Sequence, residues 1–256
     1  MGQKTHWPGQ FMGFAMTATG VTPDIVLPAF FMYDFPGEVI MATNREVFNQ
    51  IADSWYCLRH WSRFSPELKN LAHRWRGGKL LNIGCAHGPD FLPFQGAFEL
   101  WGIDFSEQMI ELAKKYAAKF NLNVNLTVGD AVHLPYPDGY FDYCIAVAVY
   151  HHISEAESRK KAFGELRRVL RRRGEAFITV WNRWQPRFLF KGKEVQVPWR
   201  SQEKVLYRYH YLYSYPEIRK QVIGAGFEII SIQPEASYHF PIDRFSRNIC
   251  VLIRAI

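Results

Sequence analysis

The chain alternates short apolar segments with amphipathic helical segments, and this order constrains its fold more than any other feature. Residues 79–83 form an apolar segment that stops at Gly84, and residues 98–103 form a second that stops at Asp104. Residues 107–120 then repeat their apolar side chains at helical spacing. Segments that are apolar on both faces are typical of parallel strands covered by helices on both sides. We therefore predict an α/β fold with a doubly wound, mostly parallel sheet and helices on both faces.

The same kinds of signal place the remaining elements. Residues 43–46 form a capping box ahead of one helix, and a second helix is expected after Pro66. Residues 154–157 form another capping box, ahead of a helix through Leu170, and Ser214 precedes the last helix. The last two expected strands should pair as an antiparallel edge. The further strands are expected at residues 124–128, 141–149, 175–180, 227–233 and 248–254.

Composition limits the classes of protein that this chain can be. With 48% apolar residues in 256, the chain can bury a full core, so disorder of the whole is excluded. A formal net charge of +7 makes nucleic acid a candidate partner and no more than that. The four cysteines lie far apart without a CxxC pair, so neither a disulfide framework nor a metal site is expected. No apolar run is long enough to span a membrane, and we expect a cytoplasmic protein.

Two segments stand apart from this regular order. Residues 1–40 are expected to be an upstream extension or a loosely docked arm, with the domain proper at residues 41–256. Residues 182–208 form an insertion between the fifth strand and the last helix. The insertion interleaves basic and aromatic side chains, which suits phosphate contacts and stacking on an unstacked RNA base. These side chains are Arg183, Arg187, Lys191, Lys193, Arg200 and Lys204, with Trp184, Phe188, Phe190 and Trp199.

A nucleoside site is expected where the carboxyl ends of the first three strands meet. The loop after the first strand, residues 84–88, contains glycines that let the backbone approach a ligand closely. Asp104 follows the second strand about twenty residues on and can accept both hydroxyl protons of a ribose. Asp130, after the third strand, can accept from the exocyclic amine of adenine, although a role in an Asx-turn is equally open. The loop lacks the G-x-G-x-x-G spacing of dinucleotide sites, which disfavours a dehydrogenase.

On these motifs the chain resembles the class I S-adenosylmethionine-dependent methyltransferases. LLNIGCAHG resembles their first motif, WGIDFSEQMIELAKK their second, and GDAVHLPYPDGYFDYCIAV their adenine loop and fourth strand. The resemblance implies a seven-stranded Rossmann-like sheet and S-adenosyl-L-methionine as cofactor. Asn82 replaces the usual Asp and Ala86 a usual Gly, which is tolerable if Asn82 bonds the loop and the φ of Ala86 is negative. The implied cofactor residues are Gly84, Cys85, Ala86, Gly88, Asp104, Phe105, Asp130, Ala131 and Ala146.

Within that class the chain is most similar to the tRNA wobble-uridine carboxymethyl methyltransferases, including the methyltransferase part of the AlkB-homologue fusion. The strings AVAVYHHIS, VPW at residues 197–199 and YRYHYLYSYPEI at residues 207–218 carry this similarity. It implies methylation of the carboxylate of 5-carboxymethyluridine, which is ionised at neutral pH and needs positioning more than a general base. The resemblance places Arg59, His151, His152 and Arg208 at the reacting carboxylate, and Trp61, Trp199, Tyr209 and His210 around the substrate.

The resemblance also implies two partners, tRNA and a small zinc-ribbon activator protein. The activator is expected on the outer strand, at Val124, Leu126 and Val128, because an uncovered edge strand invites strand addition. Two other functions stay open: a small-molecule methyltransferase acting on a quinone, sterol or metabolite acid, and a non-catalytic RNA-binding scaffold. A further basic cluster is expected at a helix end, where cations also oppose the helix dipole: Arg167, Arg168, Arg171, Arg172 and Arg173.

Overall fold

The structure is a computed structural model that describes residues 42–200 and 205–256. The predicted arm at residues 1–40, and Lys204 of the insertion, lie outside the described residues. No described helix is long and apolar enough to cross a membrane. The α-helices are α1 (Asn44–Leu58), α2 (Ser65–Trp75), α3 (Glu107–Phe120), α4 (Ala156–Val169) and α5 (Tyr215–Gly224). The strands are β1 (Gly78–Ile83), β2 (Phe98–Asp104), β3 (Val124–Val128), β4 (Phe141–Val147), β5 (Leu170–Trp181), β6 (Glu194–Arg200), β7 (Val205–Tyr211), β8 (Phe227–Pro234) and β9 (Asn248–Ala255).

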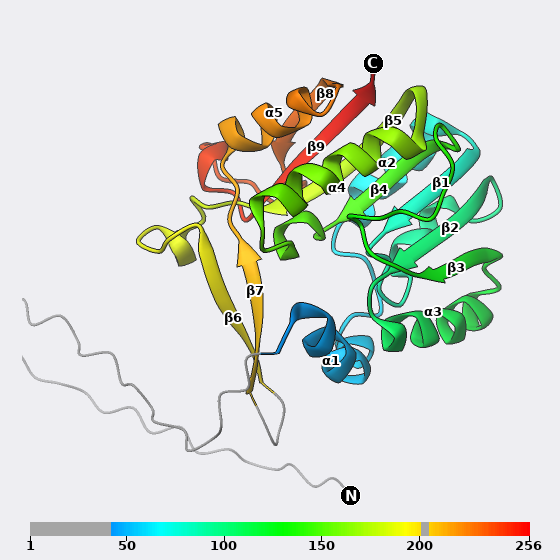
Figure 1. Ribbon diagram of the computed structural model, residues 1–256, viewed down its shortest axis with the longest axis horizontal. Helices are drawn as coiled ribbons and strands as arrows, with labels where there is room; N and C mark the ends of the chain where they lie inside the picture. Colours follow the sequence, from blue (N-terminus) through cyan, green and yellow to red (C-terminus); the bar gives the residue numbers. More distant parts are fainter. Residues whose placement is uncertain (1–41, 201–204) are drawn as a thin grey trace, which may run out of the picture. The chain divides into compact units, whose positions relative to one another are not determined.

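Seven of these strands form one sheet in the order β3-β2-β1-β4-β5-β9-β8 (Figure 1). Parallel pairing joins β1 to β2 and β4, β2 to β3, and β4 to β5. β9 runs antiparallel to both β5 and β8, so the predicted mostly parallel sheet with antiparallel C-terminal strands is confirmed. The strand order reverses between β1 and β4, which is where ligands bind in doubly wound sheets.

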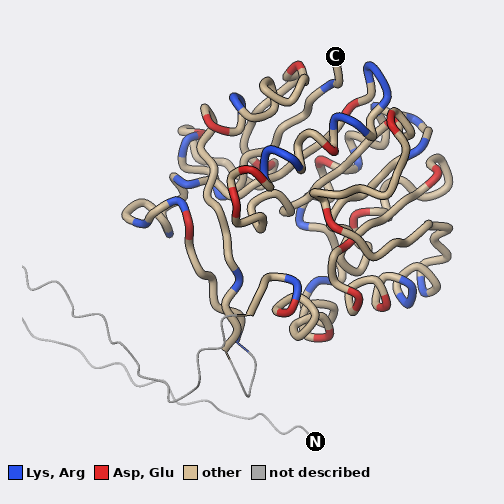
Figure 2. Tube along the Cα trace, viewed as in Figure 1, with Lys and Arg blue, Asp and Glu red and all other residues tan. Residues whose placement is uncertain are grey.

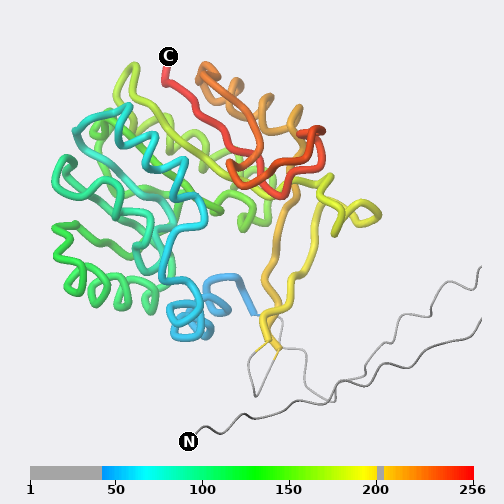
Figure 3. Tube along the Cα trace, turned by 180° about the vertical axis from the view of Figure 1, so that it is seen from behind, coloured from blue at the N-terminus to red at the C-terminus, as the bar shows by residue number. Residues whose placement is uncertain are grey.

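Helices cover the sheet on both faces, and each face has its own apolar core. One core gathers side chains of α4 and α5, such as Phe163 and Val222, against β4, β5 and β9. The other gathers side chains of α2 and α3, such as Leu68 and Ile110, against the opposite face. Figures 1 and 3 show these two layers from opposite sides. Burial from both sides explains why the central strands are continuous apolar runs in the sequence.

The structure confirms one predicted capping box and contradicts the other. At α1, Thr43 Oγ1 accepts the backbone N–H of Glu46, and the Glu46 carboxylate accepts the backbone N–H of Thr43. At α4 the predicted box over residues 154–157 is wrong, because Glu155 is the N-cap and its side chain accepts no backbone N–H of the first turn.

Helix α4 also ends earlier than predicted, at Val169, and the chain passes directly into β5. Leu170 already pairs with Phe141 of β4. The five arginines expected at a helix end are therefore divided, and that expectation is wrong for three of them. Arg167 and Arg168 lie in the last turn of α4, whereas residues 171–173 lie in the first part of β5.

The insertion contains a two-stranded hairpin in which β6 pairs antiparallel with β7. Asn44, at the start of α1, fastens this hairpin, because its side chain accepts from the N–H of Tyr209 at 2.9 Å and donates to the carbonyl of Tyr209 at 3.1 Å. The indole N–H of Trp199 donates to Ser54 Oγ of α1 at 3.0 Å. The hairpin and α1 consequently lie side by side, as Figures 1 and 3 show.

Candidate active site

A cavity of about 1100 Å³ opens where the strand order reverses. Loops that follow β1, β2, β3 and β4 line one part of it, through residues such as Gly84, Asp104 and Ala131. Helix α1 and the β6–β7 hairpin line another part, through residues such as Trp55 and Arg208. The volume is at the upper end of the range for small-molecule sites, so there is room for more than one ligand.

Asp104 ends β2 with its carboxylate buried against this cavity. Oδ2 accepts the backbone N–H of Ala86 at 2.8 Å, and Oδ1 accepts that of Ser106 at 2.9 Å. Burial raises the pKa of Asp104 to about 6, although the two N–H groups favour the ionised form. Each carboxylate oxygen keeps a lone pair beyond these contacts, so the group fits the two hydroxyls of a ribose.

The loop after β1 contains residues in the left-handed backbone region. Gly84 has φ +64°, and any Cβ there would collide with the side chain of Val149. Ala86 has φ +47°, so the expectation of a negative φ at this position is wrong. An L-residue in this region costs on the order of 1–2 kcal/mol, which is strain stored at the edge of the cavity.

Asn82 and His87 contribute buried polar atoms that have no partner among the described residues. Neither polar atom of the Asn82 amide makes a hydrogen bond, so the expectation that Asn82 bonds the loop is wrong. His87 lines the cavity with its Nε2 at 2.6 Å from the carbonyl of Arg59, and its Nδ1 has no partner. Burial lowers the pKa of His87 to about 4, so the imidazole is neutral at pH 7. Asn82 does not line the cavity, whereas the unpartnered Nδ1 of His87 fits a ligand with a polar end, such as the amino-acid part of S-adenosylmethionine.

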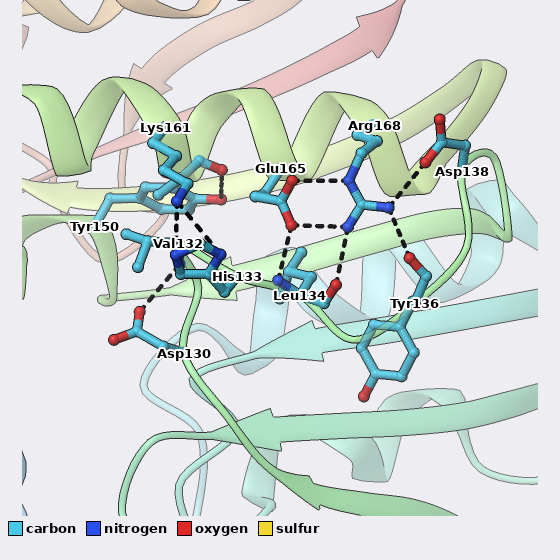
Figure 4. A network of polar contacts seen from close by, with 11 residues as sticks. Asp130, Val132, His133, Leu134, Tyr136, Asp138, Tyr150, Lys161, Glu165 and Arg168 are labelled. Atoms are coloured by element: carbon cyan, nitrogen blue, oxygen red, sulfur yellow. Dashed lines mark hydrogen bonds and ion pairs between the residues drawn. The ribbon is translucent and has the colours of Figure 1, made fainter.

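The loop after β3 is fastened to α4 by a network of polar contacts (Figure 4). Asp130 accepts the backbone N–H of Val132 at 3.0 Å, as in an Asx-turn, and it also lines the cavity. Both carboxylate oxygens of Glu165 bind Arg168 at 2.7 Å, and Arg168 donates to the carbonyl of Leu134 at 2.9 Å. The network holds the loop that carries Asp130, while contact of Asp130 with adenine stays a prediction.

Two arginines without an ion pair stand over the substrate side of the cavity. No ion pair among the described residues includes Arg59 or Arg208. Arg208 is 7% exposed, and its guanidinium carbon lies 5.1 Å from the ring centre of Trp199. The guanidinium of Arg59 lies 4.7 Å from the ring centre of Trp55. Burial lowers the pKa of Arg208 to about 10, and the positive charges of Arg59 and Arg187 add to this effect. Neighbouring cations without a counter-ion are suited to an anionic ligand.

Three neutral histidines line the cavity beside these arginines. One ring nitrogen from each of His151, His152 and His210 lies within 4.8 Å of the others. Burial lowers the pKa of all three, to about 3 for His152 and about 2 for His210. The backbone N–H of Trp181 donates to Nδ1 of His151 at 3.3 Å, which favours the tautomer with its proton on Nε2. That tautomer and the nearby charge of Arg208 both oppose a bound metal cation, so the cluster suits packing and neutral hydrogen bonding.

The structure brings most of the predicted site residues to this single cavity, and three lie outside its lining. Gly88 is not in the lining, and Ala146 is buried in the sheet core. Successive side chains of a strand point to opposite faces, so Tyr209 faces away from the side of β7 on which Arg208 and His210 line the cavity. Its hydroxyl donates to the carbonyl of Ser154 at 3.2 Å. The predicted residues in the lining are Arg59, Trp61, Gly84, Cys85, Ala86, Asp104, Phe105, Asp130, Ala131, His151, His152, Trp199, Arg208 and His210.

The sequence did not single out several other lining residues. Trp55 lies beneath Arg59, and its spacing from Phe48 on the apolar side of α1 could have suggested a shared face. Asp90 is buried, which raises the pKa of its carboxyl to about 6. Arg247 reaches the cavity from the loop before β9. No local pattern marks Asp90 or Arg247, because each comes to the cavity only through the packing of distant segments.

Several basic residues of the insertion and of the cluster at residues 167–173 are engaged within the protein. Lys193 pairs with Glu217 of α5 at 3.1 Å. Arg171 pairs with Asp142 at 2.7 Å, and Arg168 belongs to the network of Figure 4. Their charges are partly satisfied within the protein, so these residues are less available to an anionic partner.

Comparison with known proteins adds family information to this geometry. The family described as "Methyltransferase domain" matches residues 81–178. The tRNA (carboxymethyluridine(34)-5-O)-methyltransferase ALKBH8 of Mus musculus is 33% identical over 138 residues, which cover 53% of this chain and 19% of that protein. The tRNA (carboxymethyluridine(34)-5-O)-methyltransferase of Saccharomyces cerevisiae is 32% identical over 161 residues, which cover 60% of this chain and 55% of that protein. The matched regions thus span from about a fifth to about half of these relatives' lengths.

Solved structures share the fold at low sequence identity. The CcbJ methyltransferase of Streptomyces caelestis has a TM-score of 0.65 at 16% identity, covering 84% of this chain and 99% of that chain. An S-adenosylmethionine-dependent methyltransferase of Clostridium acetobutylicum has a TM-score of 0.64 at 13% identity, covering 82% and 99%. A chain in a complex of a methyltransferase activator from Haloferax volcanii matches with a TM-score of 0.59 at 16% identity. The match covers 83% of this chain and 97% of that chain.

Proposed function

We propose that this chain is an S-adenosylmethionine-dependent methyltransferase that methylates the carboxylate of 5-carboxymethyluridine at the wobble position of tRNA. The premise is the match of residues 81–178 to the family described as "Methyltransferase domain". The named relatives support the choice of substrate, because two of them are carboxymethyluridine methyltransferases at 32–33% identity. The product would be the methyl ester of the modified uridine.

One observation carries this proposal: the buried, unpaired guanidinium of Arg208 shares a cavity with the cofactor loops. Its Nε has no partner among the described residues, and Arg59 adds a second cation nearby. A quinone or a sterol offers no charge to these cations, whereas a carboxylate can take a bidentate fork of hydrogen bonds from a guanidinium. An acid substrate therefore fits the site better than a neutral one.

The chemistry asks little of the protein beyond positioning. The bound cofactor supplies an electrophilic methyl group on a sulfonium, and Asp104 and the loop after β1 would hold it. Arg208 and Arg59 would orient the carboxylate so that one oxygen faces that methyl group. The carboxylate is already ionised at neutral pH, so no residue has to remove a proton. The rings of Trp55 and Trp199 lie against the two guanidiniums, and apolar surroundings strengthen charge interactions.

Transfer assays with defined tRNA test the proposal. The purified chain is incubated with S-adenosylmethionine and tRNA that carries 5-carboxymethyluridine, and the nucleosides are then identified by mass spectrometry. Matched tRNAs with uridine or with the neutral 5-carbamoylmethyluridine at the same position serve as controls. We expect the methyl ester only from the acid. Methylation of the controls at the same rate, or no methyl ester from the acid with or without an activator protein, would overturn the proposal.

We further propose, from the resemblance, that a small zinc-ribbon activator protein docks on β3. This strand is an outer strand of the sheet, and Val128 at its end is 42% exposed. Val124 and Leu126 are partly buried against the core, so strand addition would use the free backbone edge beside them. Co-expression with the activator should give a stable complex that a Val128→Asp substitution weakens. A chain that is monodisperse and fully active alone would contradict this idea.

A further inference from the structure

Arg183 and Arg244, from two distant segments, lie over the ring of Trp184, and Arg187 and Arg247 of the same two segments line the cavity. Arg183 and Arg187 follow β5, whereas Arg244 and Arg247 lie in the loop between β8 and β9. The guanidinium carbons of Arg244 and Arg183 lie 4.2 Å and 5.2 Å from the ring centre of Trp184. We call these five residues the Trp184 platform. Figure 2 shows that basic residues occur in both of these segments.

The two segments are fastened together by buried amides. The backbone N–H of Asn182 donates to the carbonyl of Arg247 at 2.9 Å, and its side chain donates to the carbonyls of Arg244 and Ser246 at 2.8 and 2.9 Å. Gln185 donates to the Arg247 carbonyl at 3.3 Å. Both amides are buried. Buried hydrogen bonds therefore hold together the two segments that carry the arginines, so the grouping of the arginines is a feature of the fold.

No ion pair among the described residues includes any of the four arginines. Arg187 and Arg247 also line the cavity, and the charge of Arg187 contributes to the lowered pKa of Arg208. The charge of Arg187 thus acts on the buried Arg208, which connects the platform with the candidate active site. Clustered cations that form no ion pair with the described residues repel one another, and a polyanion would relieve that repulsion.

We propose that the Trp184 platform binds the phosphate backbone of the RNA substrate beside the reacting nucleotide. This inference rests on the proposed function, since it assumes that the substrate is tRNA. It also assigns Trp184 a role different from base stacking. Two guanidiniums already occupy positions over its ring, so the indole orients the cations for phosphate contact.

The test compares two double variants that remove the same charge. Arg183→Gln/Arg244→Gln removes two platform cations that do not line the cavity, and Arg172→Gln/Arg173→Gln removes two exposed cations at the far end of β5. Dissociation constants for tRNA are measured at several salt concentrations. Each lost phosphate contact should lower the slope of log affinity against log salt by about 0.7–0.9. The ratio of wild-type affinity to platform-variant affinity should therefore fall roughly tenfold between about 50 and 200 mM salt. The control variant should match the wild type at both salt concentrations.

A third variant, Trp184→Leu, keeps all the charges but removes the ring that orients them. We expect it to weaken tRNA binding several-fold, with its binding of S-adenosylmethionine unchanged in calorimetry. Equal tRNA affinity and salt slope for the wild type and the platform variant would overturn the inference. If instead the wild type itself neither binds tRNA nor methylates the carboxymethyluridine nucleoside, it is the proposed function that fails. Methylation of the free nucleoside, unchanged in the platform variant, separates the two failures.

Discussion

Replacing Arg208 should make the protein more stable and less active at the same time. The pKa of Arg208 falls from 12.5 to about 10, so burial costs the charged form about 3 kcal/mol. Its cation–π contacts with Trp55 and Trp199 stabilise the charged form by about 0.5–1 kcal/mol each. The group is protonated in both the folded and the unfolded chain at pH 7, so the net penalty of about 1 kcal/mol lies in the folded state. Arg208→Met should remove it and raise the midpoint of thermal unfolding by about 2–4 °C.

The same substitution should lower kcat/KM for tRNA roughly ten- to a hundredfold, because a charge-assisted contact contributes about 1.5–3 kcal/mol. Arg208→Lys keeps the charge without the planar fork and should fall between the wild type and the Met variant. Arg172→Met, at an exposed arginine in the first part of β5, is the control and should change neither quantity. Thermal unfolding is measured without ligands and kcat/KM by methyl transfer. A Met variant that loses several degrees of stability would show that Arg208 is structural, and unchanged kcat/KM would remove it from the site.

Three further outcomes are expected. Because the pKa of His210 drops from 6.5 to about 2 on folding, the unfolded chain binds more protons below pH 6.5, so stability should fall as the pH decreases from 6.5. In denaturant titrations, the free energy of unfolding should fall less from pH 7 to pH 5 in His210→Phe than in the wild type, by about 2 kcal/mol. An identical fall in both proteins would contradict the lowered pKa of His210. Arg168→Met should weaken S-adenosylmethionine binding about three- to tenfold in calorimetry, whereas Arg172→Met should not; equal affinities would exclude a role for the network in holding the loop. Ala86→Gly should raise the unfolding midpoint slightly, because relief of left-handed strain exceeds the added chain entropy. Ala52→Gly within α1 should lower the midpoint, and a fall in both would refute the strain.

The α/β fold could be predicted from the sequence because its signals are local. Strands buried on both faces are apolar runs, and the apolar spacing of residues 107–120 matches α3 at both ends. The order of loops after successive parallel strands also determines which residues face the ligand, so Gly84, Asp104 and Asp130 could be grouped without coordinates. These relations depend on chain order alone, and chain order is what a sequence contains.

Other features could be decided only by the tertiary structure. The left-handed φ of Ala86 and the unpartnered amide of Asn82 depend on how the loop is held by its neighbours, and both expectations were wrong. Helix α4 ends one residue before the predicted Leu170, because Leu170 pairs with Phe141 of β4.

The arginines show most plainly what the sequence determines and what only the tertiary structure decides. The sequence by itself determined that basic and aromatic residues interleave within the insertion, because that pattern needs only neighbouring positions. It could not show that Lys193 is paired with Glu217, or that Arg208 is buried without an ion pair to any described residue. Nor could it place Arg244 beside Arg183, since the buried side chain of Asn182 joins two segments some sixty residues apart. Whether a charge is free to bind a ligand depends on what the fold packs around it, and that decision belongs to the tertiary structure.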